Sequence, residues 1–371
     1  MKERINEFQL FSLIVLFEIG STTLFALGID AKQDAWIAIL LGMFFGLILL
    51  WVYTELQKSF PTKNLVEIII VLVGKTIGYP LAFLYALYFI HISTHNLNEF
   101  GNLAIITFLP ETPFVVVVSI FMFIVLYALF SGIEVLGRIS VIMIIIVLFF
   151  LINMYSLIGI SGYIDLKKLT PILSNGIKPV LGAAYPQVVN FPFGEMIVFL
   201  MYWPYVNKEK AIRKVSFLAV GMSGILLMIS LIIIVSVLGV DAASRSNIPL
   251  LEVVRRINIR DVIMHVDAIA IVNMVIGGFF KMTISFYGGI LGMITLFKIK
   301  DKRRILILGA IFTMYITIVT IPSFPFQRWL GQKVTTPYIH VPFQIIFPVL
   351  LLMINYFKRK MSLVNEDDKN V

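Results

Sequence analysis

A chain of 371 residues in which 59% are hydrophobic and 14% charged, with a mean hydropathy of +0.96, cannot hide its apolar surface as a soluble domain. It contains no cysteine, which excludes disulfides and thiolate metal sites. Its net charge of +9 does not indicate nucleic-acid binding, because the basic residues lie between hydrophobic runs and act as topology signals in a lipid bilayer.

Ten hydrophobic runs are long enough to cross the hydrocarbon core, which takes about 20 residues of helix. They lie at 9–29, 35–56, 80–106, 113–131, 138–160, 182–204, 212–239, 265–297, 305–321 and 340–357. The basic clusters at 298–304 and 358–360 fall on the side of the N-terminus, so the positive-inside rule predicts cytoplasmic termini and a cytoplasmic tail at 358–371. The shorter run 64–73 predicts an interfacial or buried loop helix.

Two of the spans carry a polar, glycine-containing interruption. In the first span it is residues 18–22 (Glu-Ile-Gly-Ser-Thr), and in the sixth it is residues 191–195 (Phe-Pro-Phe-Gly-Glu). Pro192 removes a backbone donor and Gly194 lets the chain leave helical geometry, so the two residues predict a helix break. Broken backbone is tolerated in a membrane only where protein or a watery cavity satisfies it. The breaks therefore predict a binding site.

The positions of the two breaks predict the architecture. They fall five spans apart, and an odd number of spans per repeat inverts the second copy relative to the first. We predict an all-α integral membrane protein with a 5+5 inverted repeat of the leucine-transporter type, in which helices one and six are broken. Residues 9–160 form the first repeat and residues 182–357 the second, within a single transmembrane domain at 1–371. This prediction rests on topology alone, without a residue-level repeat.

An unwound helix offers free amide groups, which favour anions, at one half-helix end and free carbonyls, which favour cations, at the other. For a zwitterionic amino acid, we predict that the carboxylate meets the amides of residues 20–22. Its ammonium meets the carbonyls of residues 189–191. Mere kinks are the alternative, since glycine and proline are common in membrane helices. The predicted ligand-binding residues are Gly20, Ser21, Thr22, Tyr88, Val189, Asn190, Phe191, Phe193 and Gly194.

Three ionisable side chains lie at membrane depth, namely Glu18 in span one, Glu195 in span six and Lys281 in span eight. In the predicted fold spans one and eight are neighbours, so the Lys281 ammonium can meet span-one carbonyls or Glu18 in place of a coupling sodium ion. Sodium-independent binding with proton coupling would follow. A structural ion pair that merely neutralises two buried charges is an equal alternative.

Span three carries Tyr88, His91, His95 and Glu99, and the last three share one helix face at a spacing of four. Two histidines four apart can chelate a metal, but the adjacent glutamate of zinc proteases is absent, and we predict no metal site. The preferred interpretation is a polar face that lines an aqueous cavity, with a proton relay as the lesser alternative. The chain has no phosphate-binding glycine-lysine loop and no nucleophile elbow, so we predict neither an enzyme nor a cofactor.

Several stretches resemble the B-subunit family of nutrient germinant receptors, the endospore germination proteins. The most specific is residues 190–195 (Asn-Phe-Pro-Phe-Gly-Glu) with residues 201–207 (Met-Tyr-Trp-Pro-Tyr-Val-Asn). Gln9 with Ile19 and Gly20, and residues 60–65 with Gly74 and Lys75, also match, and the similarity covers nearly the whole chain. Glu18 departs from the pattern, which has a more neutral residue there.

The resemblance implies membership of the amino acid–polyamine–organocation transporter superfamily. It also implies a multi-pass protein of the spore inner membrane that acts with a second membrane subunit and a lipoprotein. The sequence thus predicts a receptor subunit that binds a small nutrient, by preference an amino acid, and starts germination. A proton-coupled amino-acid permease is the alternative, and a conducting pore lined by the His91–Glu99 face is a third interpretation.

Overall fold

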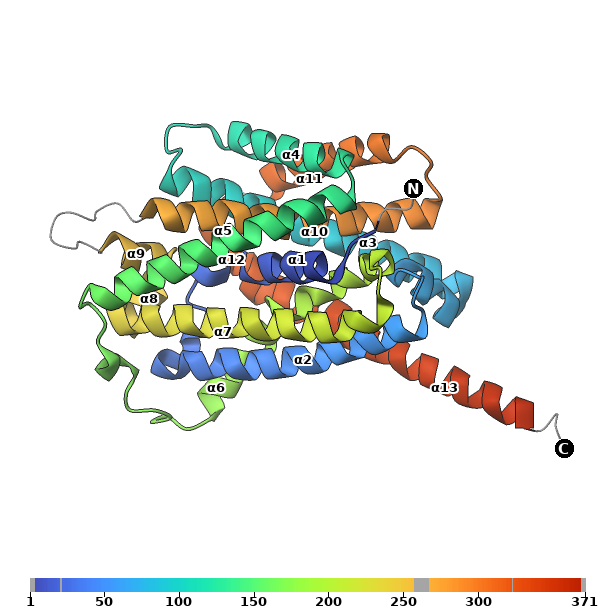
Figure 1. Ribbon diagram of the computed structural model, residues 1–371, viewed down its shortest axis with the longest axis horizontal. Helices are drawn as coiled ribbons and strands as arrows, with labels where there is room; N and C mark the ends of the chain where they lie inside the picture. Colours follow the sequence, from blue (N-terminus) through green and yellow to red (C-terminus); the bar gives the residue numbers. More distant parts are fainter. Residues whose placement is uncertain (1–3, 21, 257–266, 322, 368–371) are drawn as a thin grey trace.

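The computed structural model describes residues 4–20, 22–256, 267–321 and 323–367. These residues form a bundle of long, roughly antiparallel helices in which no β-strand occurs (Figure 1). The chain enters α1 and leaves α13 at the same end of the bundle. That arrangement requires an even number of crossings, as predicted.

The first five crossings begin with α1 (Glu7–Ile19), which ends in mid-bundle. It is followed by short 3₁₀ turns, η1 (Thr22–Leu24) and η2 (Ile29–Asp34). The remaining four are α2 (Ala35–Ser59), α3 (Leu65–Thr107), α4 (Phe114–Phe130) and α5 (Ile133–Ile160). Two of these helices start at capping boxes, where Asn6 pairs with Gln9 and Asn64 with Glu67.

The second five crossings begin with a segment that is broken throughout: α6 (Lys178–Ala183), the π-helical η4 (Ala184–Val188), and the 3₁₀ helices η5 (Phe193–Met201) and η6 (Trp203–Tyr205). They continue with α7 (Ile212–Leu238), α10 (Asp267–Phe297) and α11 (Lys302–Thr320). The last is helix ten, made of α12 (Phe324–Leu330), the π-helical η8 (Gly331–Ile346) and α13 (Phe347–Asp367). Short connecting helices are η3 (Leu166–Leu169), η7 (Glu209–Ala211), α8 (Val240–Arg245) and α9 (Pro249–Arg255).

Most predicted spans agree with these helices, and one needs correction. In the described chain, eight helical segments are long and apolar enough to cross a membrane, and the shorter α4 and the broken sixth segment complete the ten crossings. The tenth crossing begins at Phe324, not at residue 340, because its first half is helical in spite of its polar side chains. The short helix predicted at 64–73 is present as residues 65–73 of α3, which a kink at Gly74, where φ is +78° and ψ is 175°, separates from the rest of α3.

The centre of the bundle is formed by α1, α3, α10 and the sixth segment. α3 and α10 pack along much of their length, and α1 lies against α5, α7 and α10. The outer faces of α4, α5 and α11 expose large apolar side chains such as Phe123, Phe149 and Tyr315. Apolar outer faces of this kind suit contact with lipid.

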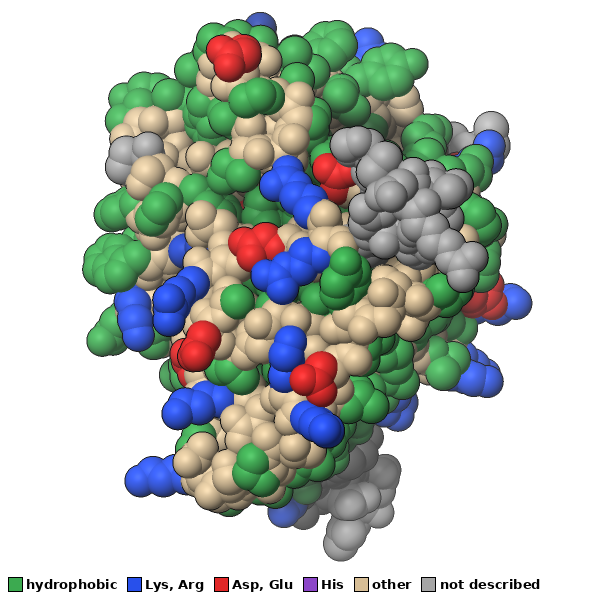
Figure 2. Space-filling model, turned by 90° about the vertical axis from the view of Figure 1, so that its left-hand side faces the viewer, with side chains coloured by type: hydrophobic (Ala, Val, Ile, Leu, Met, Phe, Trp, Pro, Cys, Tyr) green, Lys and Arg blue, Asp and Glu red, His purple; other side chains and the backbone are tan. Residues whose placement is uncertain are grey.

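The end of the bundle that carries α9 is more polar than the flanks. Figure 2 looks onto the end where α9 and the connection between α5 and α6 lie. Charged side chains of both signs are scattered over that end, and hydrophobic side chains gather around its rim. The distribution is that of a helical bundle whose flanks, not its ends, meet the apolar phase.

At the opposite end, the chain before α1 is fastened to the chain after the sixth segment. Ile5 and Val206 form an isolated parallel bridge, in which the Ile5 amide donates to the Tyr205 carbonyl at 2.9 Å and the Asn207 amide donates to the Ile5 carbonyl at 2.9 Å. The Lys208 ammonium lies 2.8 Å from the Glu7 carboxylate. We call this set of contacts the N-terminal clasp. It ties the start of helix one to the end of the sixth segment.

Candidate functional site

The break in helix one is a close contact between two backbones. α1 ends at Gly20, whose φ of +22° and ψ of −124° are not helical. A Cβ atom on Gly277 of α10 would lie 2.6 Å from both the Cα and the carbonyl oxygen of Gly20, so neither helix could approach this closely with a side chain at 277. Beyond it Thr22 is buried, and its hydroxyl has no hydrogen-bond partner among the described residues. Ser21 lies outside the described residues.

The break in helix six is held from three sides. The Asn190 amide donates to the Pro186 carbonyl at 2.6 Å, and Phe193 packs against α2 at Gly46. Gly194 faces the Gln344 side chain of helix ten so closely that no Cβ atom would fit between them. The Tyr53 hydroxyl of α2 bridges the carbonyls of Gly194 at 3.3 Å and Gln344 at 2.6 Å. The break is therefore an ordered part of the core.

Between the two breaks lies a buried cluster of charges. The Lys281 ammonium of α10 is 2.7 Å from the Glu195 carboxylate, and the two side chains are 2% and 3% exposed. The same ammonium lies over two aromatic rings, 4.1 Å from the centroid of Phe191 and 5.3 Å from that of Phe17. Glu18 is fully buried, and its carboxylate has no hydrogen-bond partner in the described chain. It interacts electrostatically with both members of the pair.

A hydrogen-bonded network joins α3 to helix ten beside this cluster. The Tyr88 hydroxyl lies 2.8 Å from Nδ1 of His340 and accepts a hydrogen bond from the Gln344 amide, also at 2.8 Å. The rings of His91 and His95 are 4.6 Å apart, edge to face. Nε2 of His95 has no partner among the described residues. An unpartnered buried polar atom is costly, so a ligand or water there would be favoured.

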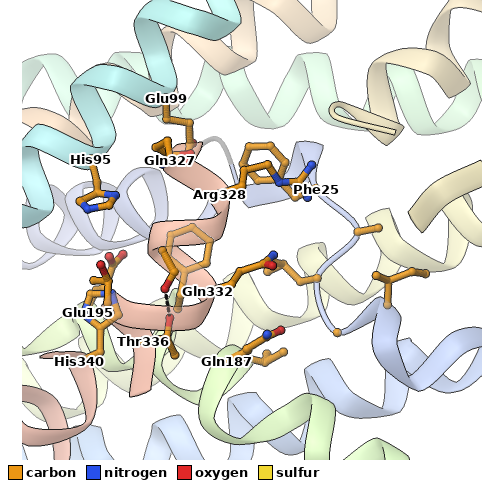
Figure 3. A pocket seen from close by; sticks show the side chains of 18 of the residues that line it. Phe25, His95, Glu99, Gln187, Glu195, Gln327, Arg328, Gln332, Thr336 and His340 are labelled. Atoms are coloured by element: carbon orange, nitrogen blue, oxygen red, sulfur yellow. Dashed lines mark hydrogen bonds between the residues drawn. The ribbon is translucent and has the colours of Figure 1, made fainter. Parts of the chain in front are cut away.

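A cavity of about 400 Å³ opens next to the cluster. Its walls come from residues 25–30 after the first break, from α3, from the sixth segment, from α8 and from helix ten. Figure 3 shows two groups of side chains in it. Glu195, His95 and His340 lie together at what we call the carboxylate end, and Glu99, Gln327, Arg328 and Phe25 lie at the arginine end.

The arginine end is organised around Arg328. Its guanidinium lies 5.7 Å from the centre of the Phe25 ring and donates to the Ser246 carbonyl at 3.4 Å. It also interacts electrostatically with Glu99 of α3. Side chains of opposite charge from helices three and ten therefore lie at this end of the cavity.

The structure brings the predicted site residues together only in part. Phe191 and Glu195 line the cavity, and so do His95 and Glu99 of the predicted polar face. Lys281 has Glu195 as its ionic partner, where the sequence offered span-one carbonyls or Glu18. Gly20, Thr22, Tyr88, Val189, Asn190, Phe193 and Gly194 are buried around the two breaks but do not line the described cavity.

The residues that sequence reasoning missed lie in helix ten. Four polar side chains recur there at every fourth position, and all four line the cavity: Arg328, Gln332, Thr336 and His340. Such spacing places them on one helix face, on the other side of the cavity from His95 and Glu99 of α3. The pattern was visible in the sequence, but hydropathy alone left the segment outside a span.

The fold and the site define an integral membrane protein of the leucine-transporter type, with ten crossings in two inverted sets of five and a cavity beside broken helices one and six. Solved structures with this fold include MhsT in complex with L-phenylalanine, with a TM-score of 0.70 and 14% identity over 95% of this chain and 89% of that one. The nucleobase-cation-symport-1 family transporter Mhp1, with bromovinylhydantoin bound, gives a TM-score of 0.59 and 15% identity over 89% and 75%. At these identities the likeness concerns the fold.

The chain belongs to the spore germination protein family, whose model matches residues 4–325. It is 34% identical to spore germination protein KB of Bacillus subtilis (strain 168), over 97% of this chain and 96% of that protein. It is 24% identical to spore germination protein YndE of the same organism, over 89% of each. The resemblance drawn from the sequence motifs is thereby confirmed.

Proposed function

We propose that this protein is the transporter-like subunit of a spore nutrient germinant receptor, and that it binds a small nutrient, by preference an amino acid, between broken helices one and six. The observation that carries the proposal is the cavity of about 400 Å³, which has Phe191 and Glu195 of the sixth break in its wall. MhsT, which shares the fold, is described in complex with an amino acid, L-phenylalanine. Family membership connects the proposal to germination.

In the proposed complex, the ligand carboxylate meets the amides of residues 20–22 and the ligand ammonium lies toward the sixth break. Bound solute would contact both broken helices at once, so it would stabilise the arrangement in which they are closest. A ligand can shift a conformational equilibrium only by its differential affinity for the two states. Contacts to both segments at once would supply such a difference, because they form fully only in the state that brings the segments together.

We further propose the cellular setting that the family implies. The protein would lie in the spore inner membrane with both termini cytoplasmic, and residues 9–160 and 182–357 would be its two repeats. A second membrane subunit and a lipoprotein subunit would detect its rearrangement and start germination. The exposed apolar faces of α4, α5 and α11 offer surface for lipid and for the membrane partner alike.

The test uses purified protein in liposomes and a panel of labelled L-amino acids, with binding and uptake measured separately. Gly194→Trp drives an indole into Gln344 at the sixth break and should abolish saturable binding. Gly221→Trp is the matched control, because nothing lies within 4 Å of the added Cβ there. Binding that survives Gly194→Trp unchanged would contradict the site. Failure of every amino acid to bind the wild-type protein would contradict the ligand class.

A proton-coupled amino-acid permease remains the second candidate, because Glu18, Glu195 and Lys281 form a buried ionisable cluster beside the cavity. Buried ionisable groups of this kind mark proton pathways in many transporters. Accumulation of a bound amino acid in the liposomes under an imposed proton gradient would favour the permease. Saturable binding without accumulation would favour the receptor.

A further inference from the structure

The ion pair at the carboxylate end faces the cavity with one partner only. Glu195 lines the cavity, whereas Lys281 approaches it from the side of α10 and is absent from the described lining. Glu195 thus borders the cavity on one side, and the protein's own ammonium neutralises its carboxylate on the other. A solute cation would compete with Lys281 for the same carboxylate.

The surroundings of Glu195 fit a primary ammonium group. The Phe191 ring, which lines the cavity, already lies over one ammonium, that of Lys281, at 4.1 Å. Aromatic faces attract cations through their quadrupole. His95 lines the same end of the cavity, and its Nε2 atom has no partner in the described chain, so a neutral ring in the fitting tautomer can accept an N–H there. His340 is coupled electrostatically to both His95 and Lys281, which places the three groups in one region.

If a ligand displaced Lys281 from Glu195, the second carboxylate of the cluster, that of Glu18, would be available to pair with the lysine. Two carboxylates, Glu18 and Glu195, accompany one ammonium, and the trio is neutral only when one carboxylate carries a proton. Glu195 is already paired with Lys281, and Glu18 has no hydrogen-bond partner among the described residues. An uncompensated buried charge is costly, so Glu18 is the group that holds the proton in the unliganded protein.

We propose that Glu195, His95 and Phe191 form a subsite for a primary ammonium group, that Lys281 is its resident occupant, and that a ligand amine displaces Lys281 onto Glu18. The inference rests on the proposed function and deepens it by naming the ligand chemistry. In the exchange, the ligand ammonium pairs with the Glu195 carboxylate, Glu18 loses its proton to solvent, and the Lys281 ammonium pairs with the new Glu18 carboxylate. One proton is released for each ammonium bound.

Few other groups can take part in this exchange. Among the described residues, the titratable groups that interact with Glu18 are Lys281 from α10, Glu195 from η5 and Tyr53 from α2. α7 carries charge only in its first turn, at Arg213 and Lys214. On α5, Arg138 pairs with Glu134, and Tyr155 hydrogen-bonds to Ser230 of α7. The proton is therefore assigned to Glu18.

Methylammonium is the probe, and its binding is measured calorimetrically on the full-length protein in detergent. Lys281→Met removes the resident ammonium and should raise the affinity for methylammonium at least tenfold over wild type. Adding Glu195→Gln should remove the site again. Tetramethylammonium, which has no N–H donor, and sodium chloride at equal ionic strength are the controls. Equal affinity in the wild type and Lys281→Met, or binding that survives in the double variant, would overturn the inference.

The failure of this inference and that of the proposed function give different results. If Lys281→Met gains a Glu195-dependent methylammonium site while no L-amino acid binds the wild type, the subsite stands and the proposed ligand class is wrong. If L-amino acids bind the wild type but the affinity for methylammonium is unchanged by Lys281→Met and by the added Glu195→Gln, the receptor proposal stands and the subsite is wrong.

A second measurement serves if Lys281→Met does not fold. Wild-type protein titrated with methylammonium in two buffers of different ionisation enthalpy should release one proton per ligand, and its affinity should rise about tenfold per pH unit. Glu18→Gln should bind more weakly and release none. Absence of proton release in the wild type, or equal release in Glu18→Gln, would overturn the displacement onto Glu18.

Discussion

The contact between Gly277 and Gly20 predicts a large effect for the smallest possible substitution. In Gly277→Ala, the added methyl group would lie 2.6 Å from the Cα and carbonyl oxygen of Gly20, where carbon atoms prefer about 3.5–4.0 Å. The obstacle is backbone, which cannot rotate away as a side chain could. α1 and α10 must separate by about 1 Å, which forfeits a quarter to a half of each dispersion contact across their interface.

Overpacking of this kind costs about 1–3 kcal/mol, and the rigid obstacle places Gly277→Ala at the upper end of that range. In a chain of this size, each kcal/mol lowers the unfolding midpoint by roughly 2 °C, so we expect a fall of about 4–6 °C in detergent. Gly221→Ala on α7 is the matched control, because its Cβ enters open space and alanine gains about 0.5–1 kcal/mol in a helix. Equal midpoints for the two variants would refute the reasoning.

Two further predictions concern buried polar contacts. Lys281→Met leaves the Glu195 carboxylate buried without its partner and should lower the free energy of unfolding by about 3–5 kcal/mol. Adding Glu195→Gln should restore much of that loss. Arg138→Met breaks a pair whose arginine is 69% exposed and should shift the unfolding midpoint little. Tyr88→Phe removes the hydroxyl that joins His340 to Gln344 and should lower the free energy of unfolding by about 1–3 kcal/mol. Tyr127→Phe, at a residue that is 71% exposed, should leave it unchanged. Similar unfolding midpoints for the two variants would contradict the role of the network.

The features that sequence predicted well are those that depend on local chemistry. Proline and glycine at 192 and 194 specify a break wherever they stand, because their backbone limits act within the helix itself. Length and hydropathy specify the crossings, because every backbone polar group in lipid must be satisfied inside its own helix. The fold followed from these two signals and from the spacing of the breaks.

Features that depend on the relative rotation of helices were harder to predict. Glu18, Glu195 and Lys281 were predicted to lie at similar depths in the membrane, but depth does not say which carboxylate faces the lysine. Phe193 sits beside the break yet turns toward α2, because the 3₁₀ geometry of η5 rotates successive side chains differently from an α-helix. The first half of helix ten was missed because a helix that lines a polar cavity is not hydrophobic all round.

The N-terminal clasp makes the two ends of the bundle energetically unequal. Opening a path to the cavity between the start of helix one and the end of the sixth segment would break two backbone hydrogen bonds, at Ile5 and Asn207, and stretch the Lys208–Glu7 pair. Two such bonds are worth about 1–3 kcal/mol together, which favours the closed arrangement by a factor of roughly 5 to 150. A carrier that opened at this end would have to break these bonds in every transport cycle. A receptor that stays closed at this end would keep them. The clasp thus favours closure at this one end of the bundle, and the opposite end has to be considered separately as a route to the cavity.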